Sequence, residues 1–253
     1  MISYLHIPTQ ALINTPISKR LFAEKAPISA AEKRILREDI ESITMKGLFQ
    51  TRTVGLQIYN DDEYLYDQII IAEVEIRSVA KAIAIAGMIQ RAFPVPMFLI
   101  LHSGDKYCVN WCVKRINQAD RTKRVIEDQQ LTRFFVIDSD DAIIGDWLLS
   151  LDVTRLHCIT LKDLFDELSC KLTILTVSDE LGVFVDSDTH KIEIYRLMLE
   201  KLEINREEQK KISAAIKGET QFNARLKLTS KLKALQLEET EIKGNNEIRY
   251  GSS

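Results

Sequence analysis

The chain has 253 residues, of which 45% are hydrophobic and 28% are charged, and its formal net charge is −3. This composition excludes wholesale disorder, because disordered chains are poor in apolar residues, and the net charge excludes a generally basic protein that coats nucleic acid. No apolar run reaches the roughly 18 residues of a membrane span, and residues 1–10 lack the charge pattern of a secretory leader. We therefore expect a cytoplasmic globular protein.

The first part of the chain predicts an irregular arm followed by a helix. Residues 1–28 are rich in proline and short apolar runs, which is typical of an arm that packs on a larger body. A helix is predicted over residues 29–43, because Ser29 and Glu32 have capping-box spacing. An apolar stripe continues this helix to its end. The stripe consists of Ile35, Leu36, Ile40 and Ile43.

The central part of the chain alternates between strand and helix patterns. A strand at residues 51–60 ends in the polar turn "NDDE", and a second strand, "DQIIIAEVEIRS", follows it at residues 67–78. An alanine-rich helix at residues 78–93 stops before Pro94, and Ser103-Gly104-Asp105 forms the turn of a hairpin. Further elements are predicted as a strand at 132–138 and helices at 140–151 and 160–172, the last capped by Thr160 and Asp163.

The character of the sequence changes at Asp188. The following residues up to 242 contain no proline and one glycine, Gly218, and they carry apolar residues at helical spacing. Two seams are visible: Tyr195, Leu199 and Leu202, and then Leu228, Leu232 and Leu235. We therefore predict an α+β body at residues 1–185 with a mixed sheet flanked by helices. A helical hairpin or coiled arm at 186–246 and a flexible tail at 247–253 follow it.

The strand at residues 67–78 carries charges that suggest two interpretations. Alternate residues share a face, so Glu73, Glu75 and Arg77 lie together while the opposite face is apolar. Two such carboxylates with Asp62 could hold Mg²⁺ in a nuclease of the restriction-endonuclease type. Arg77 stands where such a motif would carry a lysine, and a guanidinium is a poor base. The alternative is a sheet whose charged face pairs with cross-strand partners.

The cysteines raise the question of a zinc site. They are Cys108, Cys112, Cys158 and Cys170. Cys108 and Cys112 share a face of one predicted strand, and His102, His157 and Cys158 could in principle complete a zinc site with them. The close ligand pairs of small zinc modules are missing, however. We therefore interpret the cysteines as reduced, buried thiols and predict no bound metal. No phosphate-binding loop, dinucleotide motif or hydrolase elbow occurs either.

A basic cluster lies in the predicted arm. It consists of Lys210, Lys211, Lys217, Arg225, Lys227, Lys231 and Lys233, with Glu219 as the one carboxylate between them, for a local net charge of +6. Such a cluster could contact DNA phosphates, or it could lie on a helical arm that docks on a partner protein, or it could be a solvated face balanced by nearby glutamates.

Several stretches together resemble a bacterial family described as a domain of unknown function, number 4391. They are "LINTPISKRLFAEKAPISAAEKRILREDIESITM", "IIIAEVEIR", "AFPVPMFLIL", "RLHCITLKDLFDEL" and "QFNARLKLTSKLKALQ", and they extend from about Leu12 to Leu237. The resemblance implies an accessory component encoded beside helicases and adenine-specific DNA methyltransferases in defence-type loci. Members similar to this chain often carry Glu-x-Lys where this chain has Glu75-Ile76-Arg77, and the family supplies no established catalytic residues.

We therefore expect a non-enzymatic adaptor of a DNA-acting defence complex, whose arm docks a helicase or methyltransferase partner. The alternative is a metal-dependent nuclease that uses Asp62, Glu73 and Glu75.

Overall fold

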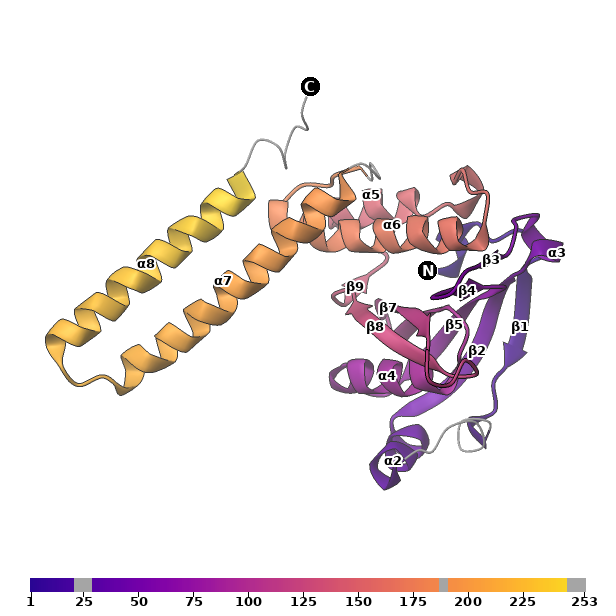
Figure 1. Cartoon of the computed structure of the whole chain (residues 1–253), viewed down its shortest axis with the longest axis horizontal. Coiled ribbons are helices and arrows are strands. Elements are labelled where there is room, and N and C mark those ends of the chain that lie inside the picture. Colours follow the sequence, from indigo (N-terminus) through magenta and orange to yellow (C-terminus); the bar gives the residue numbers. More distant parts are fainter. Residues whose placement is uncertain (21–28, 187–190, 245–253) are drawn as a thin grey trace. The chain divides into compact units, whose positions relative to one another are not determined.

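The computed structural model describes residues 1–20, 29–186 and 191–244 (Figure 1). The chain forms two compact units, Met1–Thr176 and Val177–Ser253, so the boundary falls within a long helix, α6. Within the described residues, the helices of the first unit are η1 (Ile2–Leu5), α2 (Ala30–Glu38), α3 (Thr51–Val54), η2 (Val79–Lys81), α4 (Ala82–Ala92), α5 (Ala142–Ser150), η3 (Val153–Arg155) and most of α6 (Leu161–Leu181).

A mixed sheet of seven strands forms the centre of the first unit, within the part of the chain that is described. Its strands lie in the order β1 (Leu12–Pro16), β2 (Ile40–Phe49), β5 (Ile69–Ile76), β6 (Met97–Ser103), β7 (Lys106–Ile116) and β8 (Arg124–Leu131), and β9 (Phe135–Val136) also pairs with β7. The pair β5–β6 is parallel and the other pairs are antiparallel. A parallel pair needs a crossover connection, which α4 provides. The prediction of a mixed sheet flanked by helices is confirmed.

The predicted helix over residues 29–43 is too long. The capping box at Ser29 and Glu32 is present, but α2 ends at Glu38 and the next residues form β2. A β-bulge after Ile40 adds one residue to β2, so Ile40 and Ile43 are both buried on one side. Their spacing of three therefore imitates a helical stripe.

Other local predictions fail at the sheet edges. Residues 1–28 were expected to be irregular, whereas Leu12–Pro16 form an edge strand that pairs with β2, and residues 21–28 lie outside the described part. The predicted strand at residues 51–60 is mostly the short helix α3 and a loop, with Tyr59–Asn60 forming β3. The β3 strand pairs with β4 (Leu65–Tyr66) in a separate small sheet. The edge strand β8 was not predicted.

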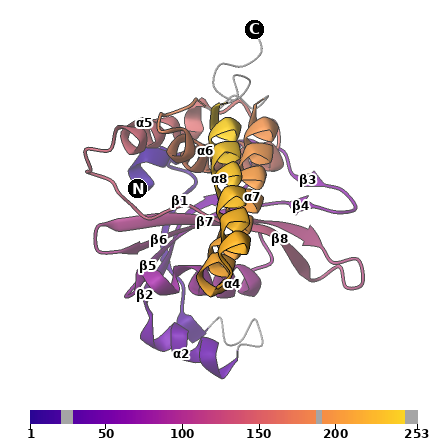
Figure 2. The ribbon, with the colours of Figure 1, turned by 90° about the vertical axis from the view of Figure 1, so that its left-hand side faces the viewer.

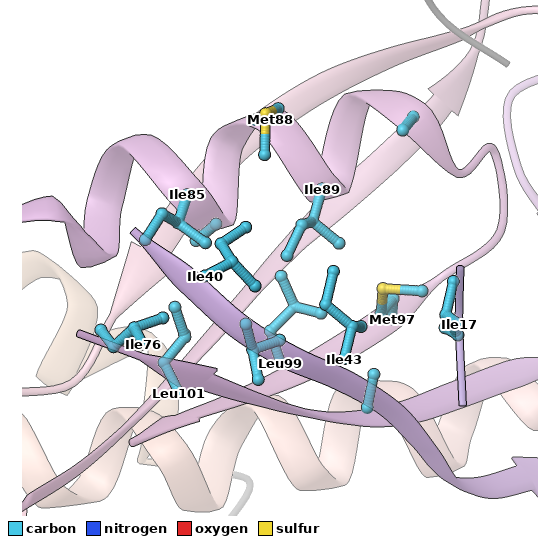
Figure 3. Packing of buried hydrophobic residues seen from close by; sticks show 14 of the residues in the cluster. Ile17, Ile40, Ile43, Ile76, Ile85, Met88, Ile89, Met97, Leu99 and Leu101 are labelled. Carbon is cyan, nitrogen blue, oxygen red and sulfur yellow. The ribbon is translucent and has the colours of Figure 1, made fainter. Parts of the chain in front are cut away.

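The sheet is covered on both faces (Figure 2). On one face α4 packs over β2, β5 and β6, and Ile85, Ile89 and Leu99 belong to the buried cluster shown in Figure 3. On the other face Ile71 and Phe98 are buried with Leu168 of α6. We expected this second face of β5 to be polar, but a second apolar core covers its first half.

The second unit contains two long helices, α7 (Ile192–Gly218) and α8 (Phe222–Gly244), which pack against each other as a hairpin (Figure 1). We name this hairpin the arm. The chain reverses at residues 219–221, so the predicted break near Gly218 is confirmed. None of the described helices combines the length and the apolar character that a bilayer-spanning segment requires. The predicted flexible tail at 247–253 lies outside the described residues.

Candidate functional site

Glu73 and Glu75 lie on β5 and both have partners on β2. Glu73 Oε2 forms an ion pair with Lys46 Nζ at 3.1 Å, and Glu75 Oε2 accepts a hydrogen bond from Ser42 Oγ at 3.1 Å. Just beyond the end of β5, Arg77 pairs with a carboxylate of β2 at 2.8 Å. The interpretation of a charged face with cross-strand partners is therefore confirmed for these residues.

Asp62 lies far from the two glutamates. It lies in the turn between β3 and β4. The nuclease hypothesis places it on a strand next to β5 in the main sheet, and that expectation is wrong. The carbonyl of the adjacent Glu63 accepts a hydrogen bond from Ile116 N, whereas Glu73 lies level with Val109 across β6. The two levels differ by seven residues of β7 (116 − 109), or about 20 Å at the rise of a strand.

The described residues contain no group of three or more His, Cys, Asp or Glu that could hold a metal ion. Asp62, Glu73 and Glu75 therefore do not form the ligand set that the magnesium-dependent nuclease alternative requires.

None of the four cysteines, which all lie within the described residues, forms a disulfide, and burial is the main cause of the raised pKa values of Cys108, Cys112 and Cys158. Burial raises the pKa of Cys108 to about 12 and the pKa of Cys112 to about 11, so both stay protonated near neutral pH. Cys158 is half-buried, and burial together with nearby carboxylates raises its pKa to about 11.

Lys114 is a buried cation that the sequence reasoning did not single out. It is only 2% exposed, and its Nζ donates hydrogen bonds to the carbonyls of Phe93 (2.7 Å) and Val95 (2.8 Å). Burial lowers its pKa to about 8. The sequence did contain a signal for this burial. Lys114 lies an even number of residues from Asn110 and the buried cysteines of β7, so their side chains share one face of the strand. Lys114 ties the end of α4 to the sheet, so its role is structural.

The arm has a heptad seam. In α7 the buried residues recur at intervals that fit a heptad: Tyr195, Met198, Leu202, Asn205 and Ile212. The predicted seam is confirmed at Tyr195 and Leu202, while Met198 is buried and Leu199 is only half-buried. On α8 the predicted seam residues are half-buried, and none of its described residues is fully buried.

A charged cluster joins both helices of the arm to the end of α6. Arg206 donates two hydrogen bonds to Glu180 (2.6 and 2.7 Å) and two to Glu239 (2.9 and 2.8 Å). Lys243 pairs with Glu180 at 2.9 Å. The hydrogen bonds from Arg206 are the main reason that the pKa of Glu180 falls to about 2. This cluster fixes the base of the arm.

A polar layer also crosses the seam of the arm. Asn205 Nδ2 donates to the Leu235 carbonyl at 3.1 Å and to Glu238 at 3.0 Å, and Gln209 Nε2 donates to Asn205 Oδ1 at 2.7 Å. A buried asparagine at a seam position is a common means of setting the register of paired helices. The antiparallel alignment of α7 and α8 is therefore specified at this layer.

The structure brings the predicted basic cluster to one end of the arm, which we name the tip. All seven side chains are exposed. They are Lys210, Lys211 and Lys217 on α7, and Arg225, Lys227, Lys231 and Lys233 on α8. Lys231 forms an ion pair with Glu208 at 2.6 Å. An open depression on the arm is lined in part by Lys210, Ser213 and Lys217.

Large apolar side chains also face solvent on the arm. On α8, Phe222 is 78% exposed, Leu226 56% and Leu237 62%. Leu226 and Leu237 are eleven residues apart, which is about three helical turns, so both lie on the same outer face of α8. Large apolar side chains that lie exposed on one face of a helix are unusual on a chain that has no partner.

A family model described as "Domain of unknown function (DUF4391)" matches residues 5–238. No curated protein and no solved structure matches the chain.

Proposed function

The chain belongs to the DUF4391 family, and from this premise we propose that it is a cytoplasmic, non-enzymatic accessory subunit of a DNA-acting complex of the restriction or anti-phage type. Its arm docks a helicase or DNA methyltransferase subunit. The observation that carries the proposal is the outer face of α8, where large apolar side chains and cations are exposed together.

The apolar residues of this face favour a protein partner. Leu226 and Leu237 are stabilised when a complementary surface removes them from water, as in helix recognition by a groove or by another helix. A leucine side chain that becomes fully buried contributes about 1.5–3 kcal/mol. Two such residues on one face together contribute about 3–6 kcal/mol when an interface buries them fully.

The cations of the tip favour a partner with an acidic surface. Exposed charges accelerate association with a surface of opposite sign and select against surfaces of the same sign. The depression that contains Lys210 and Lys217 is open to solvent and offers these cations to a carboxylate-rich partner.

The experiment is co-purification of the full chain with the products of neighbouring helicase and methyltransferase genes. The variant Leu226→Asp/Leu237→Asp should reduce the affinity for the partner by about tenfold or more, because two apolar anchors become charged. The matched control is Leu149→Asp, since Leu149 on α5 is 68% exposed and outside the arm. Equal retention of the partner by the arm variant and the control would contradict the proposal.

Direct DNA contact by Lys227, Lys231 and Lys233 is the competing role for the tip. It predicts binding to DNA without other subunits and with an affinity that falls steeply as salt rises. Reversal of these charges should then abolish DNA binding, while Leu226→Asp/Leu237→Asp should leave it unchanged. The two sets of variants therefore separate the two roles.

A further inference from the structure

We propose that the arm pairs side by side with the arm of a second copy of this chain, in antiparallel orientation. The interface is the flank of the hairpin on which Lys231 bonds to Glu208, which we name the 208/231 flank. The proposal does not rest on partner docking, because the outer face of α8 and the depression that contains Lys210 lie on other sides of the arm.

The 208/231 flank follows from helical spacing. Residues three, four, seven or eleven positions from Glu208 or Lys231 lie on the same side of their helix. Of these positions, those that lie away from the seam are Leu197, Lys201, Ile204, Lys211 and Ala215 on α7, and Ala224, Lys227, Ala234 and Glu238 on α8. The hydrogen bond from Asn205 to Glu238 crosses between the helices on this flank as well.

The apolar residues of this flank are unevenly distributed. Leu197 and Ile204, which lie toward the base of the arm, are 54% and 60% exposed. Toward the tip the corresponding positions are the alanines Ala215 and Ala224. An antiparallel second copy places the large side chains of each arm over the small ones of the other, which is the complementarity that close helix packing requires.

Two charges on the α8 side of the flank follow the same arrangement. Lys227 lies toward the tip and Glu238 toward the base, and both side chains are exposed. Their separation of eleven residues (238 − 227) equals the separation of Ile204 and Ala215 (215 − 204). One antiparallel register therefore pairs Ile204 with the partner's alanine and Lys227 with the partner's glutamate at the same time.

The heights of the two pairs also agree. The midpoint of Ile204 and Ala215 falls between residues 209 and 210 of α7, and the midpoint of Lys227 and Glu238 falls between residues 232 and 233 of α8. The bond between Lys231 and Glu208 places these midpoints within about one helical turn of each other. A single two-fold axis can therefore pass through both.

The whole arm is self-complementary in charge. Residues 210–233 carry seven cations and one carboxylate, a net charge of +6. Residues 200–208 and 238–243 together carry seven carboxylates and three cations, a net charge of −4. Antiparallel pairing sets the basic tip of each copy beside the acidic base of the other, whereas parallel pairing sets like charges together.

The contact is large enough for a specific dimer. An overlap of about 25 helical residues is about 38 Å long, and two adjacent helices are about 20 Å wide. The flank therefore buries roughly 750 Å² per copy, or about 1,500 Å² in total, which is the range of standard protein interfaces. Such a pair is a four-helix assembly in which the seam of each hairpin is better covered than in one copy alone.

The test is sedimentation equilibrium of the full chain without any partner, in low salt. We expect a dimer for the wild type, a dissociation constant raised about tenfold or more for Ile204→Lys, and a similar loss for Lys227→Glu. The double variant Lys227→Glu/Glu238→Lys restores opposite charges across the two-fold axis and should dimerise again. Lys210→Glu is the matched control on the other flank, and far-UV circular dichroism verifies that each variant keeps its helices.

A wild type that remains monomeric would overturn the proposal. So would dimers that tolerate both Ile204→Lys and Lys227→Glu, because the contact would then lie elsewhere. Glu238→Lys also removes the acceptor of the Asn205 hydrogen bond inside the arm, so urea unfolding must first show that the double variant is as stable as Lys227→Glu. If it is and the dimer is still not restored, the antiparallel register is refuted. None of these results depends on the helicase or methyltransferase, so dimerisation and partner docking succeed or fail separately.

Discussion

Replacement of Arg206 by methionine removes the cation that joins α6, α7 and α8 at the base of the arm. In the wild type the guanidinium lies between Glu180 and Glu239, with four nitrogen–oxygen distances of 2.6–2.9 Å. Methionine keeps much of the aliphatic contact and removes the charge. The two carboxylates then repel each other, and Lys243, which pairs with both, offsets only part of that repulsion.

The expected loss of stability follows from the solvent exposure of Arg206, Glu180 and Glu239. Removal of one partner from a buried ion pair costs about 3–5 kcal/mol, whereas a fully exposed pair contributes less than about 1 kcal/mol. The Glu180 and Glu239 side chains are 18% and 21% exposed, but that of Arg206 is 38% exposed and is screened by solvent. We therefore expect Arg206→Met to lower the free energy of unfolding by about 2 kcal/mol at neutral pH.

Acid should reduce this difference. The folded-state pKa of Glu180 is depressed to about 2 from 4.5, so the stability that it contributes is present above pH 4.5 and is lost as pH falls toward 2. The gap between the wild type and Arg206→Met is therefore largest at neutral pH and shrinks over that window.

The assay is hydrogen exchange of the α7 and α8 amides combined with urea unfolding followed by circular dichroism. The matched control is Arg196→Met on the same helix, because Arg196 forms an exposed pair with Glu193 and should cost less than about 0.5 kcal/mol. If Arg206→Met and Arg196→Met destabilise the arm equally, the reasoning about this cluster is wrong.

Two further predictions concern the body. Because burial depresses the folded pKa of Lys114 to about 8 from 10.5, the unfolded chain binds more protons between these values, and stability should rise by about 1 kcal/mol between pH 8 and pH 9. Urea unfolding of the wild type and of Lys114→Met between pH 7 and about pH 9 checks this. Above about pH 9 the buried thiols make stability fall as pH rises, which opposes the effect of Lys114. Identical slopes of stability against pH in the two proteins would contradict the prediction. Gly47→Ala should cost about 1–3 kcal/mol in the same assay, because its Cβ would lie 3.0 Å from Ile7 and 3.2 Å from Ile71, and an unchanged midpoint would refute the close approach.

The sequence alone was sufficient for features that depend on neighbours in the chain. Capping residues, alternation and heptad spacing act over a few residues, so the start of α2, the core face of β5 and the two helices of the arm were predictable. The basic cluster was likewise visible, because residues on two antiparallel helices that meet at a turn end up at the same tip.

Tertiary structure decided what depends on contacts across the fold. The bulge after Ile40 turned a helical spacing into a strand, because pairing with β5 outweighed the local pattern. The nuclease hypothesis needed Asp62 close to Glu73, and that distance depends on strand order and not on spacing. In the same way, only packing shows that Lys114 is buried and that Leu226 and Leu237 remain exposed to water. A pattern in sequence specifies which face of an element is apolar, but only the fold determines whether another surface covers that face.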